Sequence, residues 1–153
     1  MKRICLPLAI AAADQLIKAA VRRLPLGKAF FRIPGVIELT HYENTGAAFS
    51  LFAGNPLAIA LLTALLLAVL LFVLRSLRLT RQAKAALLCL VGGGAGNLID
   101  RVLFGAVTDY IHILPVRFPV FNFADICITL SIGYLLMLML CGRLECQTEE
   151  RHE

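Results

Sequence analysis

Long apolar stretches alternate with polar segments along the chain, and this pattern sets the expected architecture. Four of the stretches approach the roughly 20 residues that a helix needs to cross a bilayer. The pattern therefore predicts an all-α integral membrane protein with four transmembrane helices in a single domain, residues 1–153. The expected helices cover about residues 4–21, 57–74, 84–103 and 121–141, and the expected extracytoplasmic loops cover about residues 22–56 and 104–120.

The first of these loops carries a pattern of its own. Residues 36–42 follow Pro34 and Gly35 and alternate roughly between apolar and polar side chains, which is typical of a strand. Residues 44–52 begin with a turn-forming Asn and Gly and then place two aromatic side chains three positions apart. This spacing suits a short interfacial helix, although the local pattern by itself favours a surface loop with an apolar anchor. We expect a small β-like loop on the outer membrane surface.

Composition fits a membrane protein. Hydrophobic residues make up 59% of the chain and the mean hydropathy is +0.82, more than the surface of an ordinary soluble domain of this length carries. Lys2 and Arg3 before an apolar run also match the start of a secretory signal peptide. We expect a retained helix instead, because the apolar run resumes after Asp14 and Gln15.

Basic residues indicate the orientation in the membrane. Residues 75–84 carry four Lys or Arg side chains, which marks this link as cytoplasmic, and Lys2, Arg3 and Arg143 agree. Both termini then lie in the cytoplasm and the two longer loops lie outside. The formal net charge of +5 reflects this anchoring and gives little support for a nucleic-acid partner.

The five cysteines indicate neither a disulfide framework nor a metal site. Their number is odd, and no two of them have the CxxC spacing. We expect free thiols and no bound metal.

A run of glycines interrupts the third apolar stretch. Gly92 and Gly96 are four residues apart, the spacing that lets a second helix approach closely. We expect helix packing here, because no strand precedes the run and no Lys-Ser or Lys-Thr follows it, as a phosphate loop would require.

Charged and amide side chains recur within the apolar stretches. Asn97, Asp100 and Arg101 share one helical face, although the side chains of Asp100 and Arg101 point about 100° apart and need separate partners. Asp14 and Lys18 have the i,i+4 spacing of an intrahelical ion pair, which lowers the free energy of burying both charges. A structural network between helices explains these residues at least as well as direct chemistry.

Asp109 and Asp125 are the strongest candidates for chemistry. Each has a simpler explanation, since Asp125 completes a capping box that begins at Asn122, and Asp109 fits a loop near the headgroups. Both nevertheless lie near the outer ends of adjacent spans and can face each other across a cavity. Two facing carboxylates share a proton, so that one polarises a water while the other donates, as in an aspartic protease.

Two other interpretations stay open on the residues alone. A proton-coupled transporter or channel would use the membrane-embedded charges as a relay, but a relay needs charges throughout the depth of the membrane, and most of these gather at the outer end. A scaffold without catalysis would use them only to hold the helices together.

Five short motifs together resemble the lipoprotein signal peptidases, or signal peptidase II, of bacterial inner membranes. The match runs from the first expected helix to the last. The motifs are Asp14-Gln15 with Lys18, Asn44-x-Gly46-Ala47-Ala48-Phe49-Ser50, Gly96-Asn97-x-x-Asp100-Arg101, Val107-x-Asp109, and Phe121-Asn122-x-Ala124-Asp125.

The resemblance implies a multi-pass aspartic endopeptidase of the inner membrane, with its active site near the outer face. Such an enzyme removes the signal peptide of a prolipoprotein just before the cysteine that carries diacylglycerol. It works among membrane lipids, uses no metal or organic cofactor, and is the target of the antibiotic globomycin. Asp109 and Asp125 would form the catalytic pair. The supporting or substrate-binding residues would be Asp14, Lys18, Asn44, Gly46, Asn97, Asp100, Arg101 and Asn122.

Overall fold

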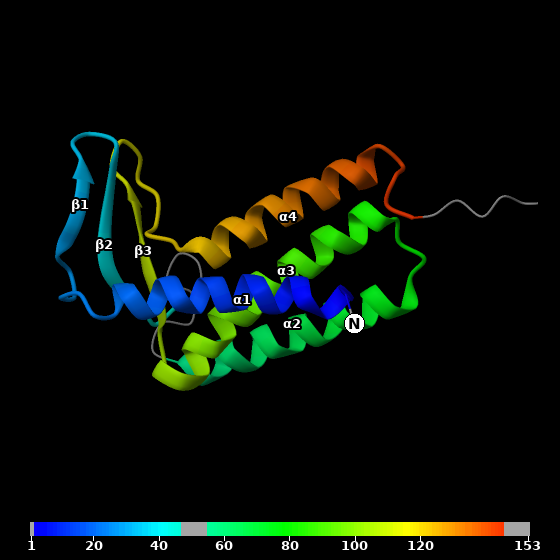
Figure 1. The fold of residues 1–153 in the computed structure, drawn as a ribbon, viewed down its shortest axis with the longest axis horizontal. Helices are drawn as coiled ribbons and strands as arrows, with labels where there is room; N and C mark the ends of the chain where they lie inside the picture. Colours follow the sequence, from blue (N-terminus) through cyan, green and yellow to red (C-terminus); the bar gives the residue numbers. More distant parts are fainter. Residues whose placement is uncertain (1, 47–54, 146–153) are drawn as a thin grey trace, which may run out of the picture.

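The computed structural model describes residues 2–46 and 55–145. In these residues four helices stand beside a small antiparallel sheet. The sheet lies at one end of the helices, and the beginning of α1 and the α2–α3 link lie at the other (Figure 1). The elements in chain order are α1 (Lys2–Val21), β1 (Ala29–Ile33), β2 (Ile37–Asn44), α2 (Pro56–Ser76), α3 (Arg81–Phe104), β3 (Val107–Ile113) and α4 (Phe123–Leu140).

All four predicted helices are present, and three of them are long and apolar enough to cross a membrane. These three are α2 from Leu57, α3 and α4. Among the described residues α1 is not one of these three, and it carries Asp14 and, in its last turn, Lys18. The prediction of four spans is therefore supported for three helices.

The prediction of an essentially all-α chain with two loops was incomplete. Residues 104–120, expected as a loop, contain β3, and the sheet has the strand order β1-β2-β3. The predicted strand at residues 36–42 is confirmed as β2, which pairs with strands on both sides. The interfacial helix expected within residues 44–52 falls largely on residues 47–54, which lie outside the described residues.

Helix boundaries follow local capping chemistry. The side chain of Thr80 accepts a hydrogen bond from the backbone N–H of Ala83 and begins α3, so the link expected at residues 75–84 shortens to residues 77–80. Gly105 ends α3 with a φ of 72°, a left-handed conformation that favours glycine. The strand β3 then starts two residues later, at Val107.

The helix α3 packs against each of the other three helices. Its glycine run explains how, because successive helical residues point about 100° apart. A Cβ atom at Gly92 would lie 2.9 Å from Ile10 of α1, one at Gly93 would lie 2.7 Å from the Ala124 carbonyl of α4, and one at Gly94 would lie 2.8 Å from Leu67 of α2. The expected role in helix packing is confirmed.

The distribution of apolar and charged side chains is the reverse of that in a soluble protein. Large apolar side chains such as Leu65 and Phe72 are exposed along α2, while Asp14, Lys18 and Asp100 are completely buried. This distribution is that of a protein surrounded by lipid, in which charged groups turn inward and pair. The buried charges lie on α1 and α3, and a separate apolar cluster includes Leu79 of the α2–α3 link and Leu138 of the last turn of α4.

Candidate active site

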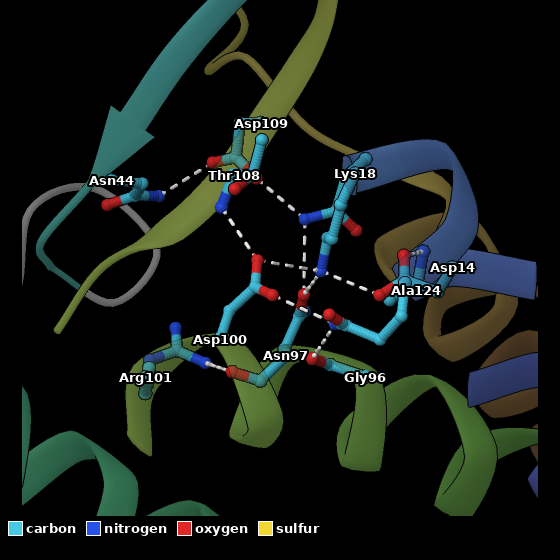
Figure 2. Close-up of polar contacts among 12 residues, drawn as sticks. Asp14, Lys18, Asn44, Gly96, Asn97, Asp100, Arg101, Thr108, Asp109 and Ala124 are labelled. Carbon is cyan, nitrogen blue, oxygen red and sulfur yellow. Dashed lines mark hydrogen bonds and ion pairs between the residues drawn. The ribbon is translucent and has the colours of Figure 1, made fainter. Parts of the chain in front are cut away.

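The polar residues predicted from the sequence meet at the end of the helices that carries the sheet. Figure 2 shows Asp109 on β3 between Asn44 of β2 and residues of α1 and α3. Hydrogen bonds and ion pairs at this end join residues from α1, α3 and α4 and from the strands β2 and β3. They include all ten predicted site residues, namely Asp14, Lys18, Asn44, Gly46, Asn97, Asp100, Arg101, Asp109, Asn122 and Asp125.

Asp109 is buried on β3, with only 2% of its surface exposed. The simpler alternative for this residue, a loop carboxylate near the headgroups, is therefore excluded. One carboxylate oxygen, Oδ2, accepts a hydrogen bond from Asn44 Nδ2 at 3.0 Å, and the other, Oδ1, accepts from Asn122 Nδ2 at 2.6 Å. Antiparallel pairing of β2 with β3 places Asn44 beside this carboxylate.

Asp125 lies in the first turn of α4 and belongs to the predicted capping box. The Asn122 side chain accepts from the Asp125 backbone N–H at 3.0 Å, and the Asp125 Oδ2 accepts from the Asn122 backbone N–H at 3.1 Å. The other oxygen, Oδ1, accepts from Asn97 Nδ2 at 2.8 Å. The capping interpretation is confirmed, and it leaves this carboxylate on the wall of a cavity.

Burial and charge change the titration of Asp109. Its pKa is raised to about 7, chiefly because burial penalises the charged carboxylate, and further because the charge of Asp125 is close. Hydrogen bonds from Asn44 and Asn122 act in the opposite direction. A carboxyl group with this pKa can hold a proton near neutral pH, so the two acids can share one proton between them.

A cavity of about 800 Å³ opens onto both acids. Its polar lining includes Asp109 and Asp125 together with Asn44, Asn97 and Arg101. No group of three or more His, Cys, Asp or Glu side chains in the described residues is arranged to hold a metal ion. The apolar part of the lining includes Ile113, Phe118, Val120, Phe121, Ile126 and Leu130.

A buried ionic cluster lies next to the acids. Lys18 Nζ is 2.7 Å from Asp14 Oδ2 and 3.4 Å from Asp100 Oδ2, and all three side chains are fully buried. Asp100 Oδ2 also accepts from the backbone N–H of Thr108 at 2.9 Å, which ties β3 to α3. Asp14 Oδ1 accepts from the backbone N–H of Ala124 at 3.1 Å, which ties α1 to the start of α4. The predicted Asp14–Lys18 pair is confirmed.

Arg101 lies apart from this cluster, as its position on the helix predicts. Its guanidinium is 3.4 Å from the Asn97 carbonyl and 3.5 Å from the Gly46 carbonyl, and it lines the cavity. The Gly46 backbone N–H donates to Asn44 Oδ1 at 3.0 Å. Gly46 thus connects Arg101 to the asparagine that contacts Asp109.

Three residues of the network were not among the predicted site residues. Gln15 Nε2 donates to Asp100 Oδ1 at 2.8 Å, and Arg22 Nη1 lies 3.2 Å from the same oxygen and 3.0 Å from Thr108 Oγ1. A helical count could have found Arg22, because it follows Lys18 by four residues and shares its face. Thr108 had no such signal, since its contact depends on where β3 lies.

Tyr110 was also not predicted, and it helps to place the start of α4. Its hydroxyl oxygen accepts a hydrogen bond from the Phe123 backbone N–H at 3.1 Å. Burial raises the pKa of Tyr110 to about 12, so this hydroxyl is neutral at physiological pH.

The amino-acid sequence is similar to bacterial lipoprotein signal peptidases over most of its length. A sequence model of the family described as Signal peptidase (SPase) II matches residues 6–141. The lipoprotein signal peptidase of Dehalococcoides mccartyi is 44% identical over 137 residues, which are 84% of this chain and 82% of that protein. The lipoprotein signal peptidase of Bacillus subtilis is 34% identical over 142 residues, which are 89% of this chain and 92% of that protein.

Two solved structures have a similar fold, and both are described as bacterial membrane enzymes. One superimposes with a TM-score of 0.85 at 26% identity and covers 97% of this chain and 94% of the other. The second has a TM-score of 0.81 at 27% identity and covers 91% of this chain and 92% of the other.

Proposed function

The chain belongs to the signal peptidase II family, and from this membership we propose that it cleaves the signal peptide from diacylglyceryl-modified bacterial prolipoproteins, just before the lipidated cysteine. Asp109 and Asp125 are the catalytic residues of this proposal. The observation that carries it is that two carboxylates, from a strand and from a helix, reach one cavity among amide donors. This is the arrangement that general acid–base hydrolysis requires.

The proposed reaction uses the shared proton. The ionised carboxylate takes a proton from a water molecule while the water oxygen attacks the carbonyl carbon of the scissile amide. The protonated carboxyl group stabilises the oxyanion that develops on the carbonyl oxygen. The C–N bond then breaks, and the leaving amine receives a proton from the pair. The raised pKa of Asp109 supports this scheme, because a carboxyl group that titrates near 7 can keep its proton at neutral pH.

The shape of the site supports a lipid-anchored peptide as the substrate. The polar groups lie at one end of helices whose outer surface is apolar, so a scissile bond at the membrane surface can meet the acids. The apolar wall of the cavity, which includes Ile126 and Leu130 along α4, suits apolar side chains of a signal peptide. Membrane lipids surround the substrate, and a globomycin-type inhibitor would occupy the same cavity.

The membrane orientation is part of the proposal. We place α1 across the membrane as the fourth span, both termini in the cytoplasm, and the sheet with the two acids near the outer face of the inner membrane. The basic side chains around the α2–α3 link, at the end opposite the sheet, support this orientation.

The deciding experiment is cleavage of a purified diacylglyceryl-modified prolipoprotein by purified protein in lipid. Asp109→Asn and Asp125→Asn should each abolish cleavage while the protein stays folded. Glu38→Gln makes the same chemical change on β2, where Glu38 pairs with Arg32 outside the cavity, and should cleave at the wild-type rate.

Three outcomes would contradict the proposal. Equal cleavage of the precursor without lipid would argue against recognition of the lipidated cysteine, and full activity of either folded Asp→Asn variant would argue against the catalytic pair. If folded wild-type protein cuts neither precursor, a scaffold or a transporter is favoured, and pH-dependent flux in liposomes separates these two.

A further inference from the structure

The two acids are contacted by three side-chain amides, and each amide must face the right way. Asn44 and Asn122 donate to Asp109, and Asn97 donates to Asp125. An asparagine amide has one donor end and one acceptor end of almost the same shape. If it were turned by 180°, its oxygen would face a carboxylate oxygen, and the contact would become repulsive. Something must therefore fix the orientation of each amide.

Backbone N–H groups fix two of the three amides. Asn44 Oδ1 accepts from the Gly46 backbone N–H at 3.0 Å, and Asn122 Oδ1 accepts from the Asp125 backbone N–H at 3.0 Å. A backbone N–H can only donate, so it selects the oxygen end of the amide. The NH₂ end of each side chain is then directed at Asp109.

Asn97 is fixed differently, by a charged side chain from another helix. The Asn97 Oδ1 accepts a hydrogen bond from Lys18 Nζ at 2.7 Å. Lys18 belongs to α1 and Asn97 to α3, so this contact joins two helices. A lysine ammonium has three donors and no acceptor. Its other two directions are taken by Asp14 at 2.7 Å and Asp100 at 3.4 Å, so the ammonium is held in place.

We propose that Lys18 is a positioning residue that fixes the Asn97 amide and thereby directs its N–H at Asp125. This inference rests on the proposed role of Asp109 and Asp125 as the catalytic pair. The Asn97 oxygen held by Lys18 also accepts from Asn122 Nδ2 at 3.1 Å, and that same nitrogen donates to Asp109. Lys18 therefore acts on both acids through one amide oxygen.

The alternative role for Lys18 is only to neutralise Asp14 and Asp100. The two roles predict different kinetics. Loss of an orienting contact should lower kcat about 100-fold with little change in KM, because catalysis is sensitive to misplacement of the reacting groups. Loss of a structural ion pair should instead lower stability and act independently of Asn97.

A double-mutant cycle on the full-length protein separates the roles. Lys18→Met removes the donor at similar length, Asn97→Leu removes the amide at similar size, and the third variant carries both changes. If Lys18 acts through Asn97, the double variant should be no slower than Asn97→Leu alone. If the fall in kcat of the double variant equals the product of the two single falls, the inference is overturned. Arg32→Met, which breaks the exposed ion pair with Glu38, is the matched control and should keep the wild-type kcat.

A measurement that needs no activity completes the test. The chain has four asparagines, so selective ¹⁵N labelling gives four side-chain amide signals, and Asn97→Leu identifies one of them. Lys18→Met should shift this signal, and Lys18→Arg, which keeps a charged donor, should restore it in part. An unshifted signal in Lys18→Met would overturn the inference.

Two further outcomes complete the design. If Lys18→Met does not fold, Asp14→Asn/Lys18→Met restores the charge balance, and its Asn97 signal is compared with that of Asp14→Asn by the same criterion. Lys18→Met could shift the Asn97 amide signal although folded wild-type protein cuts no lipidated substrate. This result would refute the proposed function and the catalytic consequence, while the contact between Lys18 and Asn97 would stand.

Discussion

Each of the two acids at the site is held by its own set of N–H donors. Asp109 accepts from two side-chain amides, whereas Asp125 accepts from one amide and from a backbone N–H in a helix cap. Asp109 is 2% exposed, and Asp125 is only partly buried on the cavity wall. The two groups are therefore chemically different, although both are aspartates. Such a difference allows one proton to be shared unequally.

The raised pKa of Asp109 makes stability depend on pH. The folded protein binds this proton more tightly than the unfolded chain between about pH 4 and pH 7, so the free energy of unfolding should fall as pH rises through that window. The contribution is at most about 4 kcal/mol, because one pKa unit corresponds to about 1.4 kcal/mol. Above pH 7 it should not change further.

The comparison that isolates this effect is wild type against Asp109→Asn, by thermal unfolding in detergent from pH 4 to pH 8. An Asn at position 109 also places an NH₂ group opposite the NH₂ group of Asn44 or Asn122, which lowers the free energy of unfolding at every pH. Only the dependence of this free energy on pH is therefore informative. The variant should gain stability relative to wild type as pH rises from 4 to 7. A constant difference across this range would refute the raised pKa.

Tyr110→Phe should destabilise the protein by about 1 kcal/mol, since it removes the acceptor of the Phe123 backbone N–H at the start of α4. The loss should be the same from pH 6 to pH 9, because the pKa of this hydroxyl is raised to about 12. Tyr134→Phe makes the same change at an exposed position of α4 and should have little effect on unfolding. Equal effects of the two changes would show that the hydroxyl contact is unimportant.

At the scale of the elements, α3 is the centre of the fold. It packs on α1, α2 and α4. Gly92 and Gly96 face α1 and allow a close approach of the two helices. This approach brings Asp14 and Lys18 of α1 next to Asn97 and Asp100 of α3. The sheet then closes the site, because β2 and β3 carry Asn44 and Asp109 to the ends of these helices. Helix packing and the position of the acids are thus coupled.

Gly96→Ala tests this coupling. A Cβ atom at Gly96 would collide with the Asp14 carboxylate, which is fully buried against Lys18. The variant should lose about 1–3 kcal/mol of stability, because the overpacked helix pair must separate. Gly133→Ala in α4 meets no neighbour within 4 Å and should be neutral or gain about 0.5–1 kcal/mol. Chemical denaturation in detergent measures both, and a neutral Gly96→Ala would contradict the close approach.

At the scale of the whole molecule, the chain separates two ends with different properties. The end with the sheet contains the buried charges and the cavity. The other end contains the α2–α3 link with basic residues on both sides. The apolar surface of the helices lies between them. A bilayer around this surface would place the two ends on opposite sides of the membrane.

Side-specific labelling tests this orientation in a variant whose five native cysteines are replaced. A membrane-impermeant reagent should label Val36→Cys, in the exposed turn between β1 and β2, from outside the cell. Leu77→Cys, in the α2–α3 link, and an epitope tag placed before Lys2 should be reached only from the cytoplasm. A tag reached from outside would show that α1 does not cross the membrane.

Features that depend on near neighbours in the chain could be predicted from the sequence. The helices follow from the length of each apolar stretch, the Asp14–Lys18 pair from a spacing of one helical turn, and the capping box from Asn122 and Asp125. The glycine run predicted close packing for the same reason. The ten candidate site residues were predicted because five motifs occur in one order, and the family assignment agrees with that pattern.

The tertiary structure alone decided how these parts meet. Asn44 and Asp109 are 65 residues apart, Asn97 and Asp125 are 28 apart, and Asp14 and Ala124 are 110 apart. No local period encodes such contacts. The strand β3 was missed because its residues are stabilised by pairing with β2, and the same pairing buries Asp109. The sequence determined which side chains are available and which helices carry them, whereas long-range packing decided which carboxylate loses water and which amide faces it.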